Sequence, residues 1–185
     1  MFGKRYIAAA AIAVALSVTV HVRDARTAQA NLEYEVKAAF LYNFAKFVEW
    51  PDTAFAGPDA PIVFCIVGSN PFDGALERVI SDRTAHGRRI VVHETAEPAP
   101  GSCHLVFTAG AEDARVARVV QTSQAAPGTP VLTVGESEAF NDAGGMIRLV
   151  VEEGGVRFDI NAALAERAGL KFSSQLLKLA RKVVR

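Results

Sequence analysis

The fold of this chain is decided by one stretch near its end, which runs Gly144-Gly145-Met146-Ile147-Arg148-Leu149-Val150-Val151-Glu152-Glu153-Gly154-Gly155-Val156-Arg157-Phe158-Asp159-Ile160-Asn161. Apolar and β-branched residues dominate its two halves, and the loop Glu153-Gly154-Gly155 separates them. Glycines take the positive φ angles that a tight reversal needs. The two halves are therefore predicted to pair as antiparallel strands.

The residues that follow carry helix signals. Asn161 is expected to cap a short helix that Gly169 ends, and Ser173 or Ser174 is expected to open a final helix over residues 174–184. That last segment has apolar residues on one face and basic residues across from them. Core packing with a solvated basic side is the favoured interpretation, and a helix lying on a membrane surface is the alternative.

Composition and the first thirty residues indicate an exported globular protein. The chain has 185 residues, half of them hydrophobic, which suits one folded domain. Residues 1–30 resemble a cleaved signal peptide, with a basic start, the apolar run Tyr6–Val20 and a small-x-small site at Ala28-Gln29-Ala30. An uncleaved anchor is the alternative, but a spanning helix needs roughly 20 apolar residues. Residues 31–185 are predicted to form a single exported domain.

Net charge argues against a nucleic-acid partner, and the length of the apolar segments argues against membrane insertion. The full chain has 20 basic and 20 acidic residues, and loss of residues 1–30 removes more basic than acidic side chains. The slightly acidic remainder gives no support to nucleic-acid binding, which normally needs a basic face. No second apolar segment is long enough for direct insertion into a membrane.

Short apolar runs alternate with helical patterns along the middle of the chain. The predicted strands are residues 62–67, 90–92, 105–107 and 131–134, and the predicted helices are residues 31–50, 72–81 and 112–124. This order predicts an α/β fold with a mixed, mostly parallel central sheet flanked by helices, a Rossmann-like three-layer arrangement. A C-terminal antiparallel hairpin and helix complete it.

The first helix is rich in aromatic residues, and two interpretations stand. Its aromatic face can simply pack on the core, or Tyr42 and Trp50 can reach a partner, because aromatic residues are enriched at interfaces. The two cysteines, Cys65 and Cys103, also leave two possibilities. In an oxidising compartment the pair most simply forms a disulfide, and two buried free thiols are the alternative.

Signals of catalysis or metal binding are weak. There is no nucleophile elbow, the histidines lack zinc-protease spacing, and the turn after residue 67 lacks the glycines and the lysine of a phosphate loop. Asp159 and Glu166 are candidate paired carboxylates, but their separation is not fixed by the sequence. No catalytic residue, metal or cofactor is expected, and the chain is not expected to be an enzyme.

A binding role has better candidates. Arg157, Asp159 and Asn161 alternate with Phe158 and Ile160, so the polar residues share one face of the strand. The alternative is that Asp159 is an ordinary strand-end acid and Asn161 only a helix cap. The segment 136–141 follows a predicted parallel strand, where ligands bind in open α/β sheets.

Seven blocks of the sequence resemble the YfiR family of exported proteins. They are the opening block Glu35-Val36-Lys37-Ala38-Ala39-Phe40-Leu41-Tyr42-Asn43-Phe44-Ala45-Lys46-Phe47-Val48-Glu49-Trp50-Pro51, the middle blocks Cys65-Ile66-Val67-Gly68 and Val134-Gly135-Glu136-Ser137, and the closing blocks Gly144 to Ile147, Arg157 to Asn161, Gly169 to Lys171 and Ser173 to Ala180. Together they span essentially the whole chain after residue 30.

The resemblance implies a periplasmic regulator. The best-known member represses an inner-membrane diguanylate cyclase by binding its periplasmic domain, and so lowers cyclic-di-GMP output. Family members dimerise, and binding of a peptidoglycan fragment has been proposed for them. The family's functional surface would correspond to Ile147, Asp159 and their neighbours. Some relatives have a second disulfide near the positions of Asn141 and Arg148, and this chain has no cysteines there.

The resemblance thus predicts a protein that binds the periplasmic domain of a diguanylate cyclase or a sensor kinase, holds it inactive, and forms a homodimer. The expected polar contacts are Asp159, Asn161 and Gln175, with Ile147 and Phe158 as packing support. The alternative is a periplasmic component that binds a small ligand or a peptidoglycan fragment for another sensor system.

Overall fold

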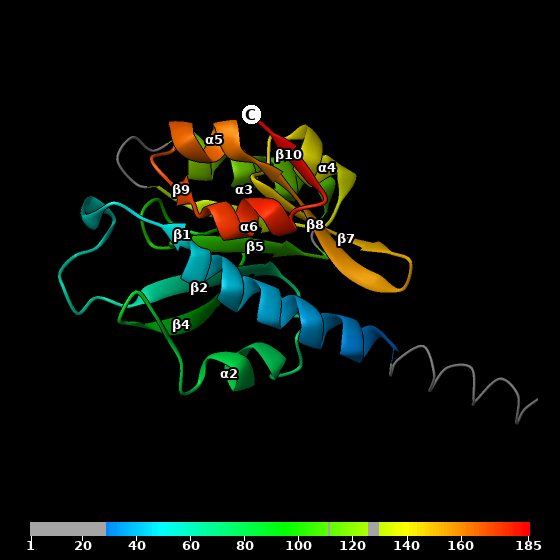
Figure 1. The fold of residues 1–185 in the computed structure, drawn as a ribbon, viewed down its shortest axis with the longest axis horizontal. Coiled ribbons are helices and arrows are strands. Elements are labelled where there is room, and N and C mark those ends of the chain that lie inside the picture. Colours follow the sequence, from blue (N-terminus) through cyan, green and yellow to red (C-terminus); the bar gives the residue numbers. More distant parts are fainter. Residues whose placement is uncertain (1–28, 111, 126–129) are drawn as a thin grey trace, which may run out of the picture.

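A computed structural model describes residues 29–110, 112–125 and 130–185 of the chain (Figure 1). The predicted signal peptide therefore lies almost entirely outside the described residues. Within the described ranges, no helix combines the length and apolar character that a membrane span requires.

One mixed sheet forms the centre of the molecule. Its strands are β2 (Ile62–Gly68), β3 (Thr84–Ala85), β4 (Arg88–Thr95), β5 (Leu105–Ala109), β6 (Leu132–Gly135), β7 (Ile147–Glu152), β8 (Gly155–Asn161) and β10 (Lys182–Val184). They lie in the order β10-β8-β7-β6-β5-β2-β4-β3. Only β7–β8 and β3–β4 pair antiparallel among these neighbours. The predicted mixed, mostly parallel sheet is confirmed.

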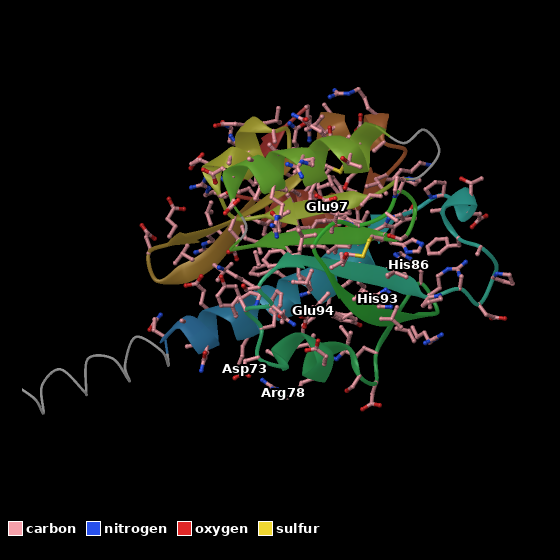
Figure 2. All side chains as sticks on the ribbon, turned by 180° about the vertical axis from the view of Figure 1, so that it is seen from behind. Asp73, Arg78, His86, His93, Glu94 and Glu97 are labelled. Atoms are coloured by element: carbon pink, nitrogen blue, oxygen red, sulfur yellow. A yellow bond between two sulfur atoms is a disulfide. The ribbon has the colours of Figure 1, made fainter. Side chains whose placement is uncertain are left out.

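Helices cover both faces of this sheet. They are the N-terminal helix (residues 29–47), α2 (Ala75–Ile80), α3 (Asp113–Ala125), α4 (Glu138–Asp142), α5 (Ala162–Arg167) and α6 (Ser174–Leu179). Leu41, Leu76 and Leu176 pack in the main core, which contains the N-terminal helix, α2 and α6. Val116 and Val120 of α3 pack with Phe140 of α4 in a separate cluster. Figure 1 shows the first group in front of the sheet, and Figure 2 shows α3 on the opposite side.

Burial explains why the central strands are continuous apolar runs. All five residues of β5 and all four of β6 are buried. Strands that are covered on both faces cannot alternate polar with apolar residues. The three-layer architecture follows directly from these unbroken runs.

The N-terminal helix ends earlier than residue 50. Residues 48–49 form β1 (Val48–Glu49), which pairs antiparallel with β9 (Lys171–Phe172). Trp50 is buried, and its Nε1 donates to the carbonyl of His104 at 3.2 Å, while the Tyr42 hydroxyl donates to the carbonyl of Thr84 at 3.3 Å. Both aromatic side chains therefore contact their own chain.

The predicted final helix over residues 174–184 is wrong in its second half. The helix α6 ends at Leu179, Ala180 is extended (φ −66°, ψ 139°), and β10 pairs in parallel with β8. Val183 lies opposite Ile160 in that pairing. Two adjacent β-branched valines favour a strand, and an edge of the sheet is available to them.

Two turns also differ in detail. The Asn70 side chain accepts a hydrogen bond from the Phe72 amide at 3.0 Å, but α2 begins only at Ala75, because Asp73 and Gly74 have positive φ. In the β7–β8 hairpin the left-handed residues are Glu153 and Gly154. Positive φ at both loop positions is the signature of a type I′ turn, so the hairpin is confirmed with a shorter loop.

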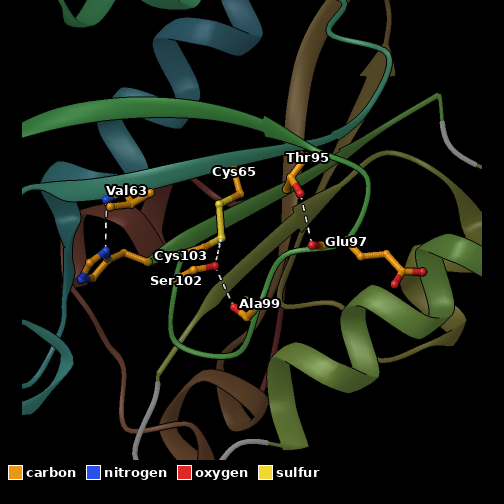
Figure 3. The surroundings of a disulfide bond; sticks show 8 residues. Val63, Cys65, Thr95, Glu97, Ala99, Ser102 and Cys103 are labelled. Carbon is orange, nitrogen blue, oxygen red and sulfur yellow. Dashed lines mark hydrogen bonds between the residues drawn. A yellow bond between two sulfur atoms is a disulfide. The ribbon is translucent and has the colours of Figure 1, made fainter.

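The expected helix caps and the disulfide are present. Asn161 accepts from the Leu164 amide and Ser173 from the Leu176 amide, and Gly169 has a φ of 81° after α5. Cys65 of β2 is bonded to Cys103, which precedes β5 (Figure 3). The disulfide prediction is therefore confirmed, and the free-thiol alternative is excluded.

Candidate functional site

The closing hairpin places its apolar and polar residues on opposite faces. Ile147 lies opposite Ile160, and Arg148 lies opposite Asp159. Ile147 and Phe158 are fully buried, and the Phe158 ring lies 5.4 Å from the ring of Phe40. These two predicted residues therefore support the site from the core, and neither is exposed for direct contact.

Asp159 is the centre of a charged cluster. Arg181, between α6 and β10, forks onto its carboxylate, with Nε 2.8 Å from Oδ1 and Nη2 2.6 Å from Oδ2. Arg148 approaches the same carboxylate from β7, with Nη2 3.8 Å from Oδ2. The hydrogen bonds from Arg181 hold the pKa of Asp159 below its ordinary value, and they raise the pKa of Arg181. Asp159 is therefore a carboxylate at neutral pH.

Each of the two arginines also contacts a second acidic residue. Arg148 also pairs with Glu138 of α4, and Arg181 lies 3.4 Å from Glu152 of β7. The Nε atom of Arg148 is buried without a hydrogen-bond partner among the described residues. Guanidinium groups bind carboxylates and phosphates in a fork, so this cluster can exchange an internal acid for one on a partner.

A cavity of about 160 Å³ opens beside this cluster. It is lined by Asn141, Gly145, Met146, Arg148, Asp159, Ile160, Asn161, Arg181, Lys182 and Val184. The structure thus brings Asp159 and Asn161 together, as predicted. The side-chain oxygen of Asn161 is committed to its helix cap, which is the alternative role foreseen for it.

Gln175 does not line this cavity. It lies in the first turn of α6, where its side chain is exposed. Leu179, one helical turn later, is 69% exposed and is the most exposed large apolar residue among the described ones. Residues four apart share one face of a helix, so Gln175 and Leu179 form a small outer surface on α6.

The segment after β6 is used mainly to hold the fold. Glu136 forms an ion pair with the buried Lys37 of the N-terminal helix, with 2.6 Å between Oε1 and Nζ, and it accepts a hydrogen bond from Tyr34. Burial lowers the pKa of Lys37, but hydrogen bonds with Glu136 and Glu33 outweigh this and raise it. Of this segment, only Asn141 reaches the cavity.

Sequence reasoning missed the three basic residues of the site: Arg148, Arg181 and Lys182. Arg148 could have been found, because strand register places it across from Asp159 once the hairpin is assigned. Arg181 and Lys182 could not, because their position depends on β10. Within the described residues, no group of three or more His, Cys, Asp or Glu is placed to hold a metal ion.

Comparison with known proteins identifies one family and two distant structures. A family model described as YfiR/HmsC-like matches residues 34–181. The crystal structure of an ABC domain in complex with L-Trp from Streptococcus pneumonia is 11% identical, with a TM-score of 0.49 over 67% of this chain and 56% of that chain. A conserved domain protein from Vibrio cholerae is 13% identical, with a TM-score of 0.44 over 65% of this chain and 54% of that one.

Neither structural likeness carries an argument about function. The chain spans just over half the length of each of the two proteins.

Proposed function

The chain belongs to the YfiR/HmsC-like family, and on that premise we propose that it represses an inner-membrane signalling protein by binding its periplasmic domain. The family consists of periplasmic regulators in the context of cyclic-di-GMP signalling. The proposed receptor is a diguanylate cyclase, and the proposed active form is a single domain over residues 31–185, exported by a cleaved signal peptide. No catalytic role is proposed for it.

The family match over residues 34–181 is the observation that carries this proposal. The surface of the closing strands supports it. The Asp159 cluster offers arginines for acidic groups of a partner, and the outer surface of Gln175 and Leu179 offers a polar and an apolar contact. Such a mixture of an apolar anchor and a charged rim is typical of protein interfaces.

Repression requires only that the protein bind the inactive conformation of its receptor more tightly than the active one. A receptor with active and inactive conformations shifts toward the one that its ligand binds more tightly. We propose that this protein prefers the inactive conformation, and that homodimerisation presents two copies of the surface to a dimeric receptor.

The decisive experiment isolates the receptor and then tests the surface. The tagged protein is cross-linked in the periplasm, membrane partners are identified, and cyclic-di-GMP is measured with and without the protein. We expect a signalling receptor to be recovered, and cyclic-di-GMP to rise when the protein is deleted. Recovery of no receptor, together with unchanged cyclic-di-GMP, would overturn the proposal.

Two variants locate the contacts without disturbing the fold. Gln175→Ala changes an exposed side chain, and Asn161→Ser removes the amide but keeps a good helix cap. Both should weaken repression at unchanged thermal stability. Lys46→Ala, an exposed change on the N-terminal helix, is the control and should repress normally.

The second candidate function is binding of a small ligand or a peptidoglycan fragment for another sensor system. The cavity beside Asp159 favours it, because it combines hydrogen-bonding side chains with the apolar residues Met146 and Ile160. A saturable small-molecule ligand without any membrane receptor would support this candidate over the first.

A further inference from the structure

The order of the strands creates a second place where a ligand can bind. The strand β4 lies on one side of β2, and the next strand of the chain to join the sheet, β5, lies on the other. The loops that leave the carboxyl ends of β2 and β5 therefore lead to opposite faces, to α2 and to α3. In open α/β sheets, ligands bind in the crevice at such a switch point.

The structure has a cavity at this point. Its volume is about 440 Å³, and its lining shares no residue with the cavity beside Asp159. Three strand ends contribute: Gly68 ends β2 and Ser69 follows it, Glu94 and Thr95 end β4, and Gly110 follows β5. Glycines allow close approach of a ligand to the backbone.

Opposite charges stand on opposite walls of this crevice. Arg115 lies in the first turn of α3, and the positive end of the helix dipole lies at the same turn. Glu94 lies on the other wall, at the end of β4 (Figure 2), where its carboxylate accepts a hydrogen bond from Asn70 at 2.8 Å. Because β4 and β5 both flank β2, the backbones of β4 and β5 lie roughly 10 Å apart, two strand spacings.

Arg115 differs from its neighbour Arg118 in its ion pairing. Arg115 forms no ion pair with the described residues, whereas Arg118, one turn later on α3, pairs with Glu97 at 2.9 Å. Glu112 adds a second carboxylate to the lining, on the same wall as Arg115, whose backbone amide donates to the Glu112 carbonyl at 2.9 Å. An anion alone would face two carboxylates, and a cation alone would leave Arg115 without a partner.

We propose that this crevice binds a small zwitterion, a free amino acid or dipeptide whose carboxylate pairs with Arg115 and whose ammonium pairs with Glu94. The proposal goes beyond receptor binding, and its experiment contains no receptor, so either proposal can fail alone.

The test uses glycylglycine as the probe, because it has two charged ends and no side chain. Purified protein is titrated while backbone amide signals are followed by NMR. We expect saturable shifts at Ser69, Thr95 and Gly110. N-acetylglycylglycine, without the ammonium, and glycylglycinamide, without the carboxylate, should each bind about tenfold more weakly, the loss typical of one charged hydrogen bond.

Variants assign each end of the probe to its wall. Arg115→Gln should weaken glycylglycine about tenfold and abolish the discrimination against glycylglycinamide, and Glu94→Gln should abolish the discrimination against the acetylated probe. Arg118→Gln, whose side chain is outside the lining, should change neither. Absence of shifts, shifts confined to the Asp159 cavity, or equal binding of all three probes would overturn the proposal.

Discussion

At the scale of single residues, Asp159 combines structure with the candidate site. Its carboxylate links β8 to the segment before β10 through Arg181, and it faces Arg148 across the hairpin. One arginine is bonded to this carboxylate and a second lies near it, so removing the charge of the carboxylate destabilises the fold. The same geometry keeps both arginines oriented toward the cavity.

The first prediction concerns that charge. Asp159→Asn should lower the free energy of unfolding at pH 7, because Arg181 loses its forked partner. The folded-state pKa of Asp159 is lowered, so its stabilisation is present above its unfolded pKa of about 4 and lost as the pH falls below that value. The difference from wild type should therefore shrink as the pH falls from 5 to 3.

Urea unfolding at pH 7, 5 and 3 measures this effect. Asp82→Asn, an exposed change in the turn after α2, is the matched control and should leave stability nearly unchanged at every pH. A difference for Asp159→Asn that persisted undiminished at pH 3 would contradict the assignment of the effect to its charge.

The second prediction concerns His104, which is buried and bonded at both ring nitrogens. The Val63 amide donates to Nδ1 at 3.0 Å, so Nε2 carries the proton that the carbonyl of Ala54 accepts at 3.1 Å. Burial lowers the pKa of His104, and Arg88 lowers it further, although the bond to Ala54 opposes this. The Phe55 ring stacks on His104 with 4.6 Å between ring centroids, and the Arg88 guanidinium carbon lies 3.8 Å from the centroid of the same Phe55 ring.

Because the unfolded chain binds a proton near pH 6.5 that the folded chain resists, the stability due to His104 is complete above that pH and lost below it. We expect wild-type stability to fall between pH 7 and pH 5, by at most about 1.4 kcal/mol per pH unit for one proton. His104→Asn should be less stable at pH 7 and should show a flatter pH dependence. His93→Asn, an exposed histidine of β4, should behave as wild type.

At the scale of elements, local signals were reliable where they act over a few residues. The caps Asn161 and Ser173 and the β7–β8 hairpin depend on local side-chain hydrogen bonds and on glycine conformation. Both can be predicted from the identity of a few neighbouring residues. The end of α6 did not follow, because residues 180–184 have an amphipathic pattern that fits a helix. Their strand conformation depends on pairing with β8, a contact distant in sequence.

The third prediction tests that strand. Val183→Ala should lower the free energy of unfolding by about 1 kcal/mol, since alanine is poor in strands and leaves part of the Ile160 contact unfilled. Val183→Ile keeps the β-branch and should be nearly neutral. If residues 174–184 formed one helix, alanine would instead stabilise the protein. Urea unfolding of the two variants distinguishes these results.

At the scale of the whole molecule, the α/β class could be predicted because both faces of the central strands are buried. The candidate site was predicted only in part. Asp159 and Asn161 follow from alternation along one strand, whereas Arg181 reaches them only after the chain has passed through α5, β9 and α6. The crevice at β2 and β5 likewise depends on strand order, which local patterns do not determine.

The fourth prediction concerns the disulfide, which ties the central strand β2 to the start of β5. The two cysteines are 38 residues apart, and in the chain-entropy model closure of such a loop stabilises a fold by about 4 kcal/mol. The double variant Cys65→Ala/Cys103→Ala should lose about that much in urea unfolding. Wild-type protein kept reduced should lose a similar amount.

The double variant should nevertheless fold. The main core, to which the N-terminal helix, α2, α5 and α6 contribute, includes neither cysteine, and β2 keeps its pairing with both β4 and β5. A stabilisation that acts by restricting the unfolded chain lowers the unfolding midpoint without altering native contacts, so the amide spectrum far from Cys65 should be unchanged. Loss of the folded spectrum throughout would mean that the bond is required to form the sheet and not only to stabilise it.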